Sequence, residues 1–145
     1  MGIFSPGAPF LSDLNLILQV VIIAFLVSAV YFRLKHSFVR HALMMGAGIS
    51  LHTVAIFAIM VPSLLSLGGL LGDLLTRFSL MTLTHATAGG LVEIMGIWLI
   101  ASWLTDTVHV EKCVKRKNVM RVTIALWLAE LVLGVYIYVM LYLGA

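Results

Sequence analysis

The chain has 145 residues, of which 62% are hydrophobic and only 10% are charged, and its mean hydropathy is +1.14. This composition excludes an ordinary soluble globular domain and indicates an integral membrane protein. Four apolar runs are long enough to cross a bilayer, which takes about 20 residues per helix; they cover roughly residues 12–32, 40–66, 79–104 and 120–143. We therefore expect an all-α fold, an integral membrane four-helix bundle that forms a single transmembrane domain over residues 1–145.

The net charge of +3 is spread unevenly along the chain. Basic side chains gather in two connections, one before the second run (Arg33, Lys35 and Arg40) and one before the fourth run (Lys112, Lys115, Arg116, Lys117 and Arg121). Basic connections of membrane proteins stay on the cytoplasmic side. We therefore expect both termini to lie outside, and we interpret the basic connections as determinants of topology rather than as a nucleic-acid surface.

Pro62 lies near the end of the second run. Proline has no backbone N–H and disfavours a helical conformation of the residue before it, so the helix is predicted to end or kink there. The connection that follows, "SLLSLGGLLGDLLTRFS", is itself apolar. It is predicted either to lie along the outer interface or to cover an opening on that side.

Few ionisable side chains fall inside the apolar runs: His52, His85, Glu93 and Glu130, with His41 and His109 nearer the cytoplasmic boundary. Such a group costs about 2.5–3.5 kcal/mol at the middle of a membrane helix, so each is a candidate functional residue. A rise of about 1.5 Å per residue places His52 and His85 at similar depths in the outer half of the membrane.

Two histidines that face each other from separate helices are what a bis-histidyl haem b requires. We therefore interpret His52 and His85 as candidate axial ligands of one haem. Gly48 and Gly89 each lie one turn from a candidate ligand, where the missing side chain leaves room for a flat macrocycle, although small residues also let membrane helices approach. His41 shares a helix face with Gly48 and His52 and is placed to meet a haem propionate.

Other interpretations of these residues stay open. Glu93 and Glu130 could form a proton path, orient a ligating imidazole, or only join helices by hydrogen bonds. A membrane histidine is as often a packed hydrogen-bonding residue as a ligand. The eight methionines raise copper as an alternative to haem, because thioether and imidazole groups suit Cu(I), but methionine is also a common filler of apolar packing.

Three segments resemble a family of small four-helix prokaryotic membrane proteins catalogued as domain of unknown function 420: "RHALMMGAGISLH", "THATAGGLVEIMGIWL" and "KRKNVMRVTIALWLAELVLGVYIYVMLYL". The resemblance covers roughly residues 33–143. It implies a multi-pass protein of the prokaryotic plasma membrane, associated with respiratory chains through haem-copper oxidase assembly or haem binding. By position it supports His41 and His85 as family-like histidines.

The chain departs from that pattern in two places. The basic entry to the last helix holds Lys115, Arg116 and Lys117, where the family often has a histidine as well. His52 lies within the second helix, whereas family members often place a histidine later. The resemblance therefore leaves the ligand pair open.

Together these features predict a b-type cytochrome-like electron-transfer subunit that binds one haem between the second and third helices. The alternatives are a haem or copper handling assembly factor for a respiratory oxidase and a structural subunit of a membrane complex. The expected partners are membrane lipid, other subunits of a respiratory complex and, as a candidate, a quinone. No nucleophile and base pair or phosphate-binding loop is present in the sequence, so the chain is not expected to be an enzyme by itself.

Overall fold

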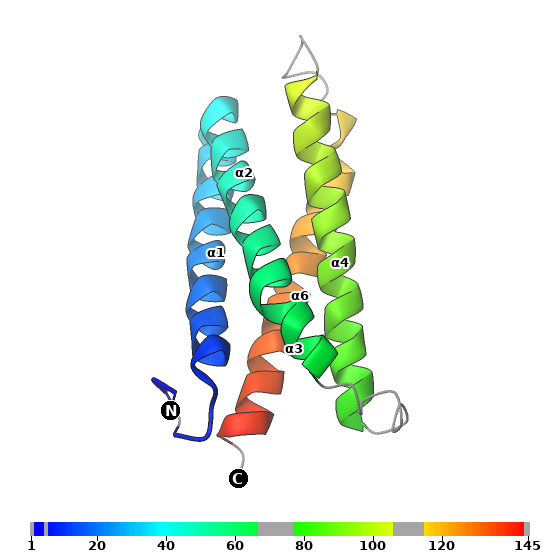
Figure 1. Ribbon diagram of the computed structural model, residues 1–145. Helices are drawn as coiled ribbons and strands as arrows, with labels where there is room; N and C mark the ends of the chain where they lie inside the picture. The colour runs from blue at the N-terminus through cyan, green and yellow to red at the C-terminus, as the bar shows by residue number, and fades with distance from the viewer. Residues whose placement is uncertain (1, 5, 67–76, 106–114, 144–145) are drawn as a thin grey trace.

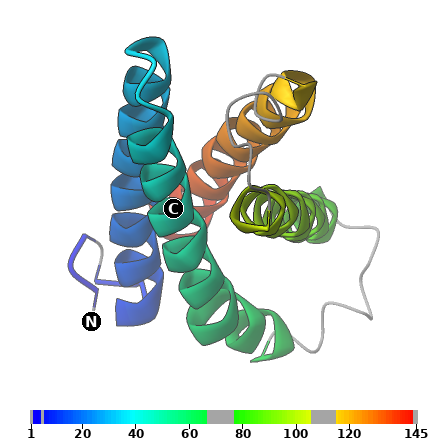
Figure 2. The same cartoon turned by 90° about the horizontal axis from the view of Figure 1, so that it is seen from above.

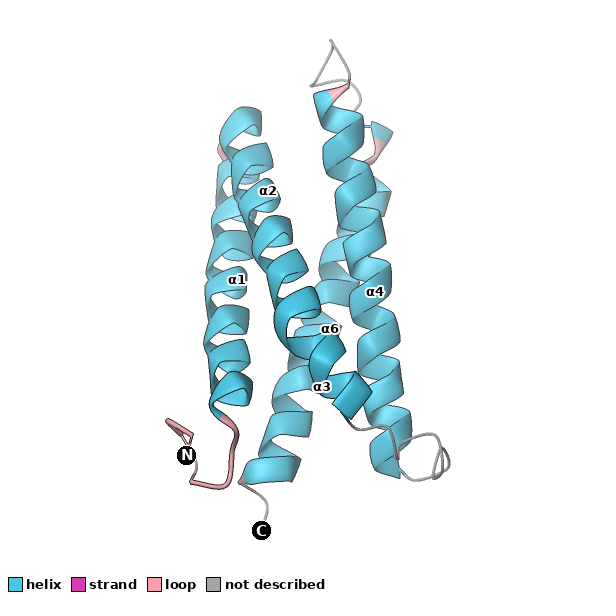
Figure 3. Ribbon diagram, in the orientation of Figure 1, coloured by secondary structure: helices cyan, strands magenta, loops and turns pink. Residues whose placement is uncertain are grey.

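The computed structural model describes residues 2–4, 6–66, 77–105 and 115–143, and all regular structure within these ranges is helical (Figure 3). Four helical stretches are long and apolar enough to cross a membrane: Phe10–Leu34, Phe38–Leu65, Leu80–Leu104 and Lys117–Tyr142. The prediction of an all-helical chain with four such helices is confirmed.

The helices form two antiparallel pairs (Figure 1). One pair joins α1 (Phe10–Leu34) to α2 (Phe38–Ala55), and the other joins α4 (Arg77–Leu104) to α6 (Lys117–Tyr142). The start of α1 and the end of α6 lie at the same end of the bundle (Figure 1). We call this the terminal end, and we call the opposite end, where α1 turns into α2, the turn end.

The second apolar stretch is bent rather than straight. After α2 the chain makes a π-helical turn, η1 (Ile56–Met60), and then continues as α3 (Val61–Ser66), which contains Pro62. Because Pro62 has no N–H to donate to the preceding turn, the hydrogen-bond ladder is locally rearranged. Seen from above, η1 and α3 lead away from α1 (Figure 2). Of the two outcomes predicted for Pro62, the structure shows the kink.

The core draws on all four long helices. Its central cluster consists of six buried side chains: Ile22, Leu26, Ile49, Val92, Trp127 and Leu131. Many other large apolar side chains point outward, and Ile94 and Val132 are about 70% exposed (69% and 70%). An apolar exterior around a small core is the distribution that a lipid environment requires.

Gly96 of α4 lies directly against the side chain of Ile49 of α2. A Cβ atom on Gly96 would lie 2.2 Å from Cδ1 and 3.0 Å from Cγ1 of Ile49. By contrast, a Cβ atom on Gly90, on the same helix, would meet nothing within 4 Å. The absence of a side chain is therefore needed at Gly96 and not at Gly90.

We expect Gly96→Leu to lower the free energy of unfolding by about 1–3 kcal/mol, because the added side chain overpacks the contact with Ile49. Gly90→Leu is the matched control and should change stability little. Unfolding followed by circular dichroism in mixed micelles measures both. Equal losses in the two variants would show that the α2–α4 contact is not the cause.

Candidate functional site

Four ionisable side chains meet in the interior of the bundle. They are His52 from α2, His85 and Glu93 from α4, and Glu130 from α6. His52, Glu93 and Glu130 are at most 7% exposed. We call these four residues the histidine–glutamate cluster. All four were singled out from the sequence, and the structure brings them together.

Glu93 holds α4 against α2. One of its carboxylate oxygens lies 2.9 Å from Nδ1 of His52, and the other accepts a hydrogen bond from the hydroxyl of Thr53. The hydroxyl of Thr53 also lies 2.9 Å from the carbonyl oxygen of Ile49 on its own helix. Glu93 is therefore satisfied at both oxygens by two consecutive residues of α2.

Glu130 lies between the two histidines. Its Oε2 is 4.0 Å from Nε2 of His52, and its Oε1 is 3.4 Å from Nδ1 of His85. The backbone carbonyl oxygen of Glu130 is also 3.2 Å from Nδ1 of His85. Within the described residues, Nε2 of His52 and both carboxylate oxygens of Glu130 have no hydrogen-bond partner. The cluster therefore runs in the order Glu93, His52, Glu130, His85.

Gly134 admits the ring of His85 against α6, whereas a Cβ atom on Gly89 would make an ordinary van der Waals contact. A Cβ atom on Gly89 would lie 3.6 Å from Oε1 of Glu130, and one on Gly134 would lie 2.8 Å from Cε1 of His85. Gly48 packs against Phe25 and Trp127. Gly48 and Gly89, predicted to leave room for a macrocycle, thus adjoin protein side chains.

Apolar packing closes the cluster toward the turn end. The ring of Trp127 packs on the ring of His52, with centroids 5.3 Å apart, and Trp127 is fully buried. Trp127 and Ile49 belong to the central apolar cluster, and each precedes a cluster residue by three positions. Protons and water therefore meet an apolar layer on this side.

His41 makes a separate contact near the turn end. It is buried, and its Nδ1 lies 2.9 Å from the carbonyl oxygen of Ala29, so it joins α2 to α1. The structure gives it this backbone partner rather than a place in the histidine–glutamate cluster. His109 and Cys113 lie outside the described residues.

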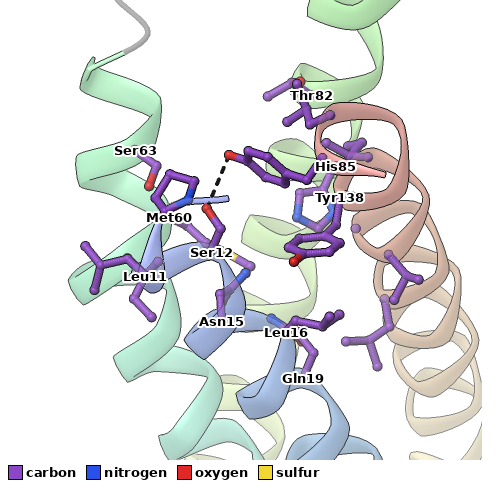
Figure 4. Close-up of a pocket in the computed structure, with 18 of the residues that line it drawn as sticks. Leu11, Ser12, Asn15, Leu16, Gln19, Met60, Ser63, Thr82, His85 and Tyr138 are labelled. Carbon is purple, nitrogen blue, oxygen red and sulfur yellow. Dashed lines mark hydrogen bonds between the residues drawn. The ribbon is translucent and has the colours of Figure 1, made fainter. Parts of the chain in front are cut away.

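A cavity of about 560 Å³ borders the cluster on the terminal side (Figure 4). His85 forms part of its wall, and α1 contributes Ser12, Asn15 and Gln19. Our sequence analysis missed these three polar residues. Their 3–4 spacing places them on one face of the first apolar run, and that periodicity was the signal that could have found them.

Asp13 is a second residue that the sequence analysis missed. It is fully buried, and its carboxylate accepts hydrogen bonds from the hydroxyl of Tyr138 and from the backbone N–H groups of Ile3 and Phe4. The start of the chain is thereby fastened to α1 and α6. The sequence feature that could have identified Asp13 is its position as a single carboxylate at the start of the first apolar run.

Among the described residues, no group of three or more His, Cys, Asp or Glu side chains is arranged to hold a metal ion. No protein-family model, curated protein or solved structure matches the chain.

We expect His52→Leu to lower the free energy of unfolding by about 3 kcal/mol, because it leaves the Glu93 carboxylate buried without its imidazole partner. The double variant His52→Leu/Glu93→Leu should lose clearly less than the sum of the two single variants, since it removes both polar partners. Unfolding in mixed micelles measures this coupling. His41→Leu combined with Glu93→Leu is the control, and additivity is expected there. Additive losses for the His52 pair would contradict a coupled contact.

Proposed function

We propose that this chain is a proton-transferring subunit of a membrane electron-transfer complex. The observation that supports the proposal best is the alternation of carboxylate and imidazole groups in the order Glu93, His52, Glu130, His85 across three helices. Side chains of this kind inside membrane helices are rare, and chains of Asp, Glu and His mark proton relays in pumps and transporters.

The chemistry of the groups suits proton transfer. An imidazole accepts a proton at one ring nitrogen and releases one from the other, and a carboxylate accepts a proton at either oxygen. The separations of 3.4 Å and 4.0 Å around Glu130 are longer than N–H···O hydrogen bonds, which measure about 2.7–3.2 Å. A rotation of the Glu130 side chain is needed to close them. The unpartnered atoms of His52 and Glu130 face these gaps.

The surroundings of the histidine–glutamate cluster determine from which end of the bundle protons reach it. The cavity adjoins His85, whereas Trp127 and Ile49 close the side toward the turn end. Protons are therefore exchanged through the terminal end, and the cluster serves as a proton store for a redox partner. We propose, from the basic connections, that the terminal end faces the outside of a prokaryotic plasma membrane.

Trp127 offers a direct readout of proton arrival, because a protonated imidazole beside an indole ring quenches its fluorescence. In a Trp98→Phe/Trp103→Phe background Trp127 is the only tryptophan. After a rapid drop in pH, we expect fluorescence to fall as His52 gains a proton. Glu130→Gln should slow this fall by at least about tenfold while keeping its amplitude, since a positioned general acid–base group contributes factors of that order or more. Stopped-flow fluorescence of the protein in lipid nanodiscs is the measurement.

His52→Gln should abolish the pH-dependent change, and His41→Gln is the matched control, because His41 is also buried on α2 but makes a different contact. An unchanged rate in Glu130→Gln would show that protons do not reach His52 through Glu130. A pH-independent signal in the parent protein would exclude proton exchange with the cluster.

A b-type cytochrome is the second candidate, supported by how the two histidines are held. Nδ1 of His52 faces a carboxylate and Nδ1 of His85 faces a backbone carbonyl, which is the anchoring seen in ligating histidines and leaves Nε2 for the iron. His52 and His85 would hold a haem b through these Nε2 atoms. The haem would supply one-electron transfer. The Glu130 side chain lies between the two rings and would have to move aside.

If haem binds there, the protein purified from its native membrane should show reduced alpha and Soret absorption bands, because two axial imidazoles hold a low-spin iron. His52→Ala and His85→Ala should each abolish the bands, while His41→Ala should keep them. A colourless, folded native protein would exclude the cytochrome and leave the proton relay untouched. A colourless protein with stoichiometric copper would instead support a copper handling assembly factor, as the resemblance to domain of unknown function 420 suggests.

A further inference from the structure

The cavity at the terminal end contains amide groups that the protein leaves without partners. Within the described residues, Nε2 and Oε1 of Gln19 and Oδ1 of Asn15 have no hydrogen-bond partner, although Gln19 is only 7% exposed. Both side chains line the cavity (Figure 4). A polar group buried without a hydrogen bond is unfavourable, so such a group is commonly the place where a ligand or water binds.

The lining restricts the chemistry of a ligand. No acidic or basic side chain other than the imidazole of His85 is found among the described residues that border the cavity, so a phosphate headgroup would find no lysine or arginine there. Most of the lining is apolar, including Leu16, Ile59, Leu131 and Val135. The ligand is therefore uncharged and largely apolar.

Polar side chains line the cavity from α1, α3, α4 and α6, and those of α1 and α4 include groups suited to bind a ligand. Asn15 and Gln19 of α1 offer amide donors and acceptors, and His85 of α4 offers an imidazole. A purely aliphatic chain would leave all of these groups unused. A flat ring with an oxygen on each of two opposite sides would form hydrogen bonds with the amides of α1 on one side and with the imidazole of His85 on the other. The volume of about 560 Å³ lies within the range of small-molecule sites, about 300–1,000 Å³.

We infer that this cavity binds the ring of a quinone or quinol, with one oxygen at the amides of Asn15 and Gln19 and the other at His85. The inference concerns binding and holds whether or not the histidine–glutamate cluster transfers protons. A quinol bound in this way would also be placed to exchange protons with the histidine–glutamate cluster. Its hydroxyl would lie at His85, whose Nδ1 is 3.4 Å from Oε1 of Glu130.

Decylubiquinone is a suitable probe, and isothermal titration of the full chain in nanodiscs measures its binding, with empty nanodiscs as the blank. We expect saturable binding at one site per chain. Gln19→Leu should weaken it by about tenfold or more, because two hydrogen-bonding atoms are lost from the site. This variant should fold, since its parent amide has no partner to lose. Thr87→Val is the matched control, because Thr87 is exposed and does not line the cavity.

Three results would overturn the inference: no saturable binding of decylubiquinone, equal affinity in Gln19→Leu, or equal affinity for n-decanol, which has a chain but no ring. The last result would identify a site for acyl chains instead. Should Gln19→Leu fail to fold, the comparison of decylubiquinone with n-decanol on the parent protein still decides the question. Binding of decylubiquinone without a pH-dependent change in Trp127 fluorescence would support the quinone site and contradict the relay, so that the two failures are distinguished.

Discussion

The burial of the Glu130 carboxylate is the constraint on which the rest of the bundle depends. A carboxylate in an apolar interior is strongly unfavourable unless polar groups surround it. Here two histidines approach it from α2 and α4, and Gly134 provides the space for the ring of His85. Three helices are thereby positioned about one side chain.

This arrangement divides the bundle into two unlike halves. Toward the turn end, Trp127 packs among the apolar side chains of the central cluster, and His41 is buried farther along against the backbone of α1. Toward the terminal end, the π-turn and Pro62 lead the second stretch away from α1, and the cavity lies between α1, α4, α6 and this bent segment. The kink is therefore part of what shapes the cavity, because a straight α2 would continue alongside α1.

Hydropathy predicted the four long helices, since length and apolar composition suffice for that. The rise per residue also predicted that His52 and His85 lie at matching depths, and the structure joins both to Glu130. What could not be predicted is helix rotation, which decides which group lies between the histidines. When every face of a helix is apolar, the sequence gives little indication of which face points into the bundle. Gly48 could therefore be interpreted as leaving space for a macrocycle, although it packs against Trp127. Whether Asn15 and Gln19 line a cavity depends on the same rotation. It also depends on the direction of the bend after α2, which Pro62 alone does not determine.

Proton transfer and haem ligation make competing demands on the same atoms. Nε2 of His52 faces Glu130 across 4.0 Å, so an iron on that nitrogen would interrupt the path from Glu130 to His52. The relay requires Glu130 to stay between the rings, whereas a shared haem requires it to leave. Glu93 is compatible with both roles, because it holds Nδ1 of His52 in either case. The position of the Glu130 side chain is therefore the structural variable that separates the two functions, and in this structure it lies between the two histidines.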